Sequence, residues 1–132
     1  MPELHLQDLS RYRLERSAAM LLSAKRDFDA CDYASANNRA YYSLFHAMRS
    51  ILALDSIDFK KHSAVIAHFG QEYLKTDRIP RSFGALIATA TLIRNRSDYE
   101  DFYVCSIEET KRLLDGAEEF LTIVRDFLAN LS

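Results

Sequence analysis

The 132-residue sequence predicts an all-α fold, an antiparallel up-and-down bundle of about five helices. Three glycines and two prolines are too few for the many turns of a sheet-rich protein. Apolar residues recur at helical spacing along most of the chain. Hydrophobic residues make up 48% and charged residues 27%, which is typical of a globular protein. With no repeat or linker to divide it, we treat 1–132 as one helical domain.

The first two predicted helices cover Leu9–Phe28 and Tyr33–Leu54. The polar stretch between them suits a tight turn, and Asp32 is placed to cap the second helix. The expected core side of the first helix consists of Leu14, Ala18, Leu21, Leu22 and Phe28. That of the second consists of Tyr33, Asn37, Ala40, Tyr41, Leu44, Ala47, Met48 and Ile51.

The middle of the chain predicts two more helices between short loops. Residues 55–61 are predicted to form a loop, and a third helix is predicted over Ser63–Lys75. This helix is expected to end in the segment 76–80. The fourth helix begins near Arg81 and carries apolar residues as far as Ile93.

The last helix has the clearest start signal. The polar and aromatic segment Asn95–Cys105 is either a connection or a frayed end of the fourth helix. Ser106 and Glu109 then have the spacing of a capping box, which predicts a helix continuing to Asn130. Its apolar side consists of Leu114, Ala117, Leu121, Val124 and Leu128.

Charge and motif content exclude several functions. The net charge of −2 and pI of about 6.1 give no overall positive field, so binding of nucleic acid would require a local basic patch. No apolar run approaches the ~20 residues of a membrane span, and the start lacks the order of a signal peptide, which predicts a cytoplasmic protein. Cys31 and Cys105 are therefore expected to be reduced. No histidine spacing suits zinc, and no cofactor is predicted.

The second helix carries an unusual mixed stripe. Two cations, an imidazole and aromatic rings share one side of this helix, formed by Arg39, Tyr42, His46 and Arg49, with Asn38 and Phe45 at its edge. One interpretation is a half-buried helix whose arginine and histidine side chains bond to neighbouring backbone or carboxylate groups. The other is a surface for anion binding or self-association, because guanidinium groups bind phosphate and stack on rings.

The apolar side of the fourth helix ends in a cation. Arg94 falls on the same side as Phe83, Ile87 and Ala90. A buried guanidinium needs an anion or a cleft. One partner is Asp98, one helical turn later, if the helix continues. The alternative is a ligand phosphate, with Arg96 adding charge.

These residues also carry a family resemblance. The string from Asn38 to Ala47, NRAYYSLFHA, resembles the second-helix signature of HEPN domains. KHSAVI at 61–66, followed by Phe69 and Gly70, is similar to the opening of the family's third helix. RNRSDY at 94–99 stands where the family carries its motif at the end of the fourth helix, so the resemblance spans nearly the whole chain.

The resemblance implies a helical bundle that forms a homodimer, with the motif helices of two subunits facing one cleft. It also implies toxin-like, metal-independent ribonucleases, encoded beside a small nucleotidyltransferase that acts as antitoxin. The family motif is an arginine, four to six other residues and a histidine. Arg94 matches the arginine, but the first permitted histidine position holds Tyr99, and counting from Arg96 finds no histidine either.

Three hypotheses follow. The first is a HEPN protein with a degenerate motif that binds nucleotide or RNA through Arg94, Arg96, Asp98 and Tyr99. A tyrosine, with an ordinary pKa near 10, is a poor base at neutral pH but can stack or donate. The second is an active ribonuclease toxin in which Tyr99, or His46 across the cleft, replaces the missing histidine. The third is a helical module that docks a copy of itself or another partner through the Tyr42–Phe45–Arg49 face.

Overall fold

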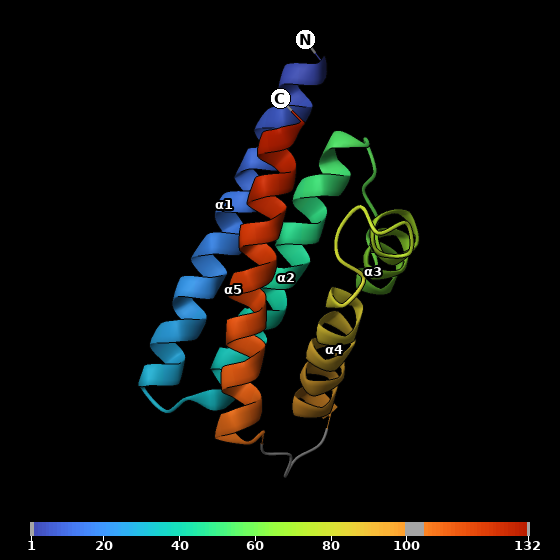
Figure 1. The fold of residues 1–132 in the computed structure, drawn as a ribbon. Coiled ribbons are helices and arrows are strands. Elements are labelled where there is room, and N and C mark those ends of the chain that lie inside the picture. The colour runs from blue at the N-terminus through green and yellow to red at the C-terminus, as the bar shows by residue number, and fades with distance from the viewer. Residues whose placement is uncertain (1, 100–104, 132) are drawn as a thin grey trace.

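The computed structural model describes the backbone of residues 2–99 and 105–131, and the side chains of 5–97 and 105–131. Within these residues the chain is all-helical, which confirms the predicted fold class. Figure 1 shows three long helices side by side, α1 (Pro2–Asp29), α2 (Tyr33–Leu54) and α5 (Ile107–Asn130). The shorter α3 (His62–Phe69) and α4 (Phe83–Tyr99) lie beside α2, and both ends of the chain lie at the same end of the bundle.

The helix starts that depend on side-chain caps were predicted correctly. The Asp32 side chain accepts a hydrogen bond from the Ser35 backbone N–H, and α2 has the predicted bounds. The Ser106 hydroxyl accepts from the Glu109 N–H and caps α5, which ends at Asn130 as expected. Each cap satisfies an amide at the first turn that has no partner within the helix.

Three predicted boundaries were wrong or incomplete. Helix α1 begins at Pro2 rather than Leu9, and α4 begins at Phe83 rather than Arg81. The predicted third helix is divided, because a π-helical turn, η1 (Gly70–Leu74), follows α3. This wider turn is closed by the Lys75 N–H, which donates to the Gly70 carbonyl oxygen at 2.8 Å. Residues up to Tyr99 continue α4, and the rest of the expected connection at 100–104 lies outside the described residues.

The expected core side of α1 is confirmed except at Leu22. Leu21 is buried in the core, and Leu14, Ala18 and Phe28 pack against it, whereas Leu22 is 51% exposed. Ser10, Arg13 and Ser17, which were not predicted, are also buried. The hydroxyls of Ser10 and Ser17 donate to the carbonyl oxygens of Ser50 and Ser43 at 2.6 and 2.7 Å, and these small side chains let α1 lie close against α2.

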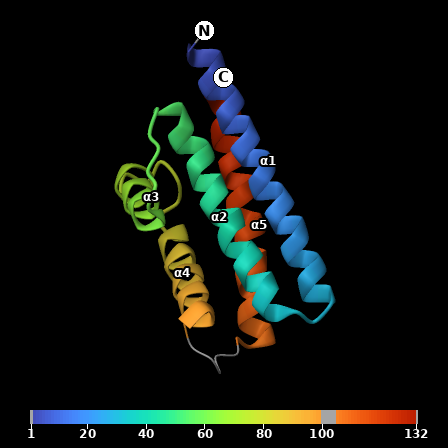
Figure 2. The ribbon, with the colours of Figure 1, turned by 180° about the vertical axis from the view of Figure 1, so that it is seen from behind.

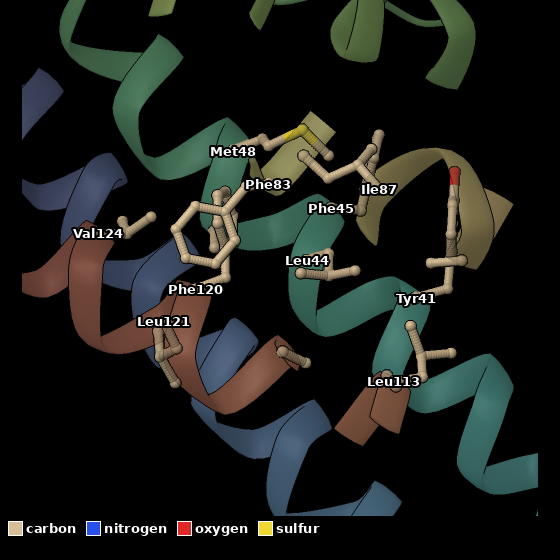
Figure 3. Close-up of a cluster of buried hydrophobic side chains, with 14 of the residues drawn as sticks. Tyr41, Leu44, Phe45, Met48, Phe83, Ile87, Leu113, Phe120, Leu121 and Val124 are labelled. Atoms are coloured by element: carbon tan, nitrogen blue, oxygen red, sulfur yellow. The ribbon is translucent and has the colours of Figure 1, made fainter. Parts of the chain in front are cut away.

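The core surrounds α2 and includes buried residues of α1, α3, η1, α4 and α5. Apart from Tyr33, which is half-buried, the predicted core side of α2 is confirmed. Figure 3 shows Leu44 and Met48 of α2 beside Phe83 and Ile87 of α4 and Phe120 of α5. Because this packing fixes α4 against α2, it also positions the polar end of α4 over the first half of α2.

Candidate functional site

Arg94 of α4 lies over two aromatic rings of α2. Its Cζ is 4.8 Å from the centre of the Tyr41 ring and 5.5 Å from that of Tyr42. Its Nη2 donates to the Tyr42 hydroxyl at 3.4 Å. A guanidinium over a ring face is held electrostatically, and its planar edge remains suited to a carboxylate or phosphate. The rings therefore orient the half-buried Arg94 side chain.

A hollow of about 220 Å³ opens beside this cation. It lies between the first half of α2 and the second half of α4. The exposed Arg39, whose Nη1 donates to Asn38 Oδ1 at 3.1 Å, brings a second guanidinium to the hollow. The lining consists of Ala34, Ser35, Asn38, Arg39, Arg94 and Ser97. Two guanidinium groups and two hydroxyl-bearing residues form a concave surface rich in hydrogen-bond donors, which suits an anion.

His62, which the sequence did not predict as a site residue, contacts the Tyr41 side chain on which Arg94 lies. The Tyr41 hydroxyl and His62 Nδ1 are 3.0 Å apart, and the His62 ring stacks on Phe45 with centroids at 4.0 Å. Burial raises the pKa of Tyr41. Burial, followed by the charges of Arg94 and Arg49, lowers the pKa of His62, which therefore stays neutral at pH 7.

His46 lies one helical turn beyond Tyr42, with the ring centroids 6.1 Å apart. Burial, followed by the charges of Arg16, Arg49, Arg13 and His62, lowers the pKa of His46 to about 4. The imidazole is therefore neutral at pH 7, and a group with so low a pKa is a weak general base there.

The far end of the stripe is an ion-pair cluster. Arg49 Nη2 lies 2.9 Å from Asp58 Oδ1, and Arg13 Nη2 lies 3.5 Å from the same oxygen. Phe45, expected at an exposed edge, is 3% exposed, because His62 covers one face of its ring. The prediction of an exposed aromatic docking face is therefore wrong for Phe45.

The structure thus divides the predicted site residues into groups. Asn38, Arg39 and Arg94 line the hollow, Tyr42 supports Arg94, and His46 and Arg49 lie farther along α2. Arg96 is exposed and is not among the lining residues. The side chains of Asp98 and Tyr99 lie outside the described residues. The Arg94–Asp98 pair and the role of Tyr99 therefore stay predictions.

Sequence reasoning missed Arg13, Asp58 and His62 as members of this region. Arg13 is a buried charged residue of α1 that apolar spacing does not detect, and Asp58 lies in a loop with no periodicity. The similarity of residues 61–66 to the family's third helix singled out the segment that holds His62, without indicating its contact with Tyr41. Among the described residues, no cluster of three or more histidine, cysteine or acidic side chains could hold a metal ion. None of their helices has the length and apolar character needed to cross a bilayer.

Over residues 2–99 and 105–131, the bundle of α1 to α5 and the arginine near the end of α4 are of the kind that the HEPN class of helical proteins has. The HEPN domain model matches residues 10–127, and the chain belongs to this family. A "UPF0332 protein" of Thermotoga maritima is 31% identical over 97 residues, covering 74% of each chain. "Putative toxin MJ0142" of Methanocaldococcus jannaschii is 28% identical over 115 residues, covering 87% of this chain and 78% of that protein. The chain is thus similar to proteins of a toxin-like group.

Proposed function

We propose that this HEPN protein binds the phosphate groups of nucleotide or RNA in the hollow between α2 and α4. The observation that carries the proposal is that Arg94 and Arg39 line one concave surface, with Arg94 fixed over two rings. Guanidinium groups held in advance lose little freedom when they bind a phosphate.

The residues support binding better than cleavage. The expected motif histidine is replaced by Tyr99. His46 is a poor substitute because its pKa is about 4, and the pKa of His62 is lowered as well. A base that acts at neutral pH works best with a pKa near 7. We therefore expect phosphate binding without efficient hydrolysis.

The relatives named as toxins support a place in a two-component system. The resemblance stated above implies a homodimer and a nucleotidyltransferase partner, and both belong to this proposal. The adjacent reading frame is the direct observation, since a small nucleotidyltransferase gene there would support the paired system. Light scattering at tens of micromolar tests the dimer, and a monomer at that concentration would contradict it.

The binding proposal is tested by titrating the protein with ATP and with short RNA. We expect Arg94→Ala to weaken binding of both by at least tenfold, because it removes the cation held over Tyr41 and Tyr42. Arg112→Ala, an exposed arginine on α5, is the matched control and should bind like the wild type. Absence of ATP binding at millimolar concentration, or equal affinity of Arg94→Ala and the wild type, would refute the proposal.

An active ribonuclease toxin is the competing function, favoured by the names of the relatives and by the bond between Tyr41 and His62 beside Arg94. Growth arrest and RNA cleavage on expression, both abolished by Arg94→Ala, would establish it. Intact cellular RNA in cells that express the wild-type protein would leave binding as the function.

A further inference from the structure

A groove runs along the seam between α1 and α5. A hollow of about 470 Å³ lies at the end of the bundle that holds both chain ends, and a second of about 230 Å³ lies farther along the same seam. Arg125 lines both hollows, so we treat them as one groove, the α1–α5 groove. In Figure 2, α1 lies on one side of α2, and α3 and α4 lie on the other. The groove is therefore on a different side of the bundle from the hollow between α2 and α4.

The residues that line the groove have the spacing of a helix-packing surface. Lys25 Nζ lies 2.9 Å from Glu118 Oε1, which sets the antiparallel register of α1 and α5. From this pair, lining residues recur on both helices at alternating steps of three and four. They are Leu14, Ala18 and Leu21 on α1, and Leu121, Arg125 and Leu128 on α5. A further helix packs along two neighbours at this spacing. Arg11 and Lys25, near the two ends of the groove, are about 21 Å apart along α1, or three to four helical turns.

The floor of the groove is apolar and open to water. Leu14 and Leu128 are half-buried, whereas Leu22 is 51% and Leu131 is 56% exposed. Leu22 lines the smaller hollow, and Leu131 lines the larger one. Covering such a surface with a second apolar surface is favourable, because it removes both from water. An amphipathic helix carries apolar side chains at the spacing of this floor.

The charged side chains in the groove favour an acidic occupant. Those that the described part of the chain contributes are Arg11, Lys25, Arg125 and Glu118. Glu118 is already paired with Lys25. Arg11 lies 3.8 Å from Asp8, but both side chains are at least 70% exposed, so this ion pair is weak. Arg125 is exposed and, among the described residues, has no ion-pair partner. A carboxylate on the occupant therefore has a cation available beside the apolar floor.

We propose that the α1–α5 groove binds an amphipathic helix of an acidic partner protein. The apolar side of that helix covers Leu14, Leu22 and Leu128, and a carboxylate at its edge pairs with Arg125. A second copy of this chain fits less well, because a two-fold axis would set one concave, cationic groove against another and leave both unfilled. The groove lies away from Arg94, so the proposal does not depend on nucleotide binding.

The probe is a fluorescently labelled, 21-residue synthetic peptide with leucine at the first and fourth positions of each heptad and glutamate at the flanking positions. A matched peptide carries lysine in place of these glutamates. Fluorescence anisotropy with nanomolar peptide, which limits peptide self-association, measures the dissociation constants. The acidic peptide should bind at least fivefold more tightly than the basic one.

Two variants with matched controls test the groove itself. Arg125→Gln should weaken binding of the acidic peptide several-fold, whereas Arg112→Gln, which removes an exposed arginine of α5 beside α4, should not. Leu22→Ala should weaken binding about fivefold, because it removes apolar contact area. Leu92→Ala, which truncates a leucine of α4 that is 58% exposed, is its control and should bind like the wild type.

Three results would overturn the proposal. The first is no binding of the acidic peptide at about 1 mM protein, or equal binding of the two peptides. The second is equal affinity of Arg125→Gln and Arg112→Gln for the acidic peptide. The third is a Leu22→Asp variant whose oligomeric state, measured by light scattering, differs from that of the wild type, because the groove would then be covered by a second copy.

Discussion

Arg94 of the candidate site packs on the ring of Tyr41, which belongs to the hydrophobic core. The Arg94 guanidinium lies 4.8 Å from the centre of a ring that is itself 2% exposed. The Tyr41 ring is therefore both a packed core residue and the surface that orients the Arg94 guanidinium. Its hydroxyl, 3.0 Å from His62 Nδ1, also joins α2 to the start of α3. Variants that remove either the Tyr41 ring or only its hydroxyl show which part orients Arg94 and which part stabilises the fold.

Tyr41→Phe keeps the ring and removes the hydroxyl. We expect it to lower the free energy of unfolding by about 1 kcal/mol, the usual contribution of a hydrogen bond, and to leave ATP affinity within about twofold. Tyr41→Leu removes the platform and should weaken ATP binding by about fivefold, from a cation–π contribution of about 1 kcal/mol. Urea denaturation and ATP titration measure both effects. Equal ATP affinity of the two variants would show that the ring does not orient Arg94.

The low pKa of His46 predicts loss of stability in mild acid. A folded-state pKa of about 4 lies below the ordinary value of 6.5, so the unfolded chain binds the proton more tightly. The contribution to stability is complete above pH 6.5 and declines as the pH falls toward 4. Between pH 7 and pH 5 the free energy of unfolding should fall by about 1 kcal/mol, less than the full shift would give, because solvent screens the partly exposed imidazole.

Urea denaturation at pH 7, 6 and 5 measures this decline. His46→Asn should remove most of it, because the variant has no imidazole at this position to gain a proton. His62, whose pKa is also lowered, contributes in the same direction, and His62→Asn measures that share. A pH dependence that is the same in His46→Asn and in the wild type would contradict the assignment of the effect to His46.

The sequence predicts which site residues share one side of a helix, but it does not predict which residues of different helices are in contact. Helical spacing predicted that Arg94 ends the apolar side of α4, and that Arg39, Tyr42, His46 and Arg49 share one side of α2. Both follow from the rotation per residue, which is a local property. The contacts of Arg94 with Tyr42 and of Tyr41 with His62 depend on how separate helices pack. No periodicity encodes such contacts, so they required the structure.

The buried side of α1 was predicted only in part. Leu14, Ala18, Leu21 and Phe28 lie in or against the core as apolar spacing predicted, whereas Leu22 is exposed. Ser10 and Ser17, which bond to α2, and Arg13 are buried as well. Apolar spacing does not detect buried polar side chains, so it missed Arg13 and its ion pair with Asp58.

The adjacent leucines of α1 test which of them the core contains, since the sequence predicted both. Leu21 is 6% exposed and belongs to the core, whereas Leu22 is 51% exposed. Leu21→Ala should lower the free energy of unfolding by about 2–4 kcal/mol, and Leu22→Ala by less than about 0.5 kcal/mol. Denaturant unfolding of both variants under the same conditions gives the comparison. Equal losses would favour the sequence prediction that both leucines are buried, and a larger loss at Leu22 would contradict the structure.

Ser17 and Ser43 lie at a close contact between α1 and α2. Ser17 is fully buried, and its hydroxyl donates to the Ser43 carbonyl oxygen at 2.7 Å, so little space separates α1 from α2 here. Ser17→Ala removes the bond and should lower the free energy of unfolding by about 1 kcal/mol. Ser17→Leu must also force the helices apart and should lower it by about 3 kcal/mol. Urea denaturation measures both, and a Ser17→Leu variant as stable as Ser17→Ala would show that the two helices are not closely packed at this position.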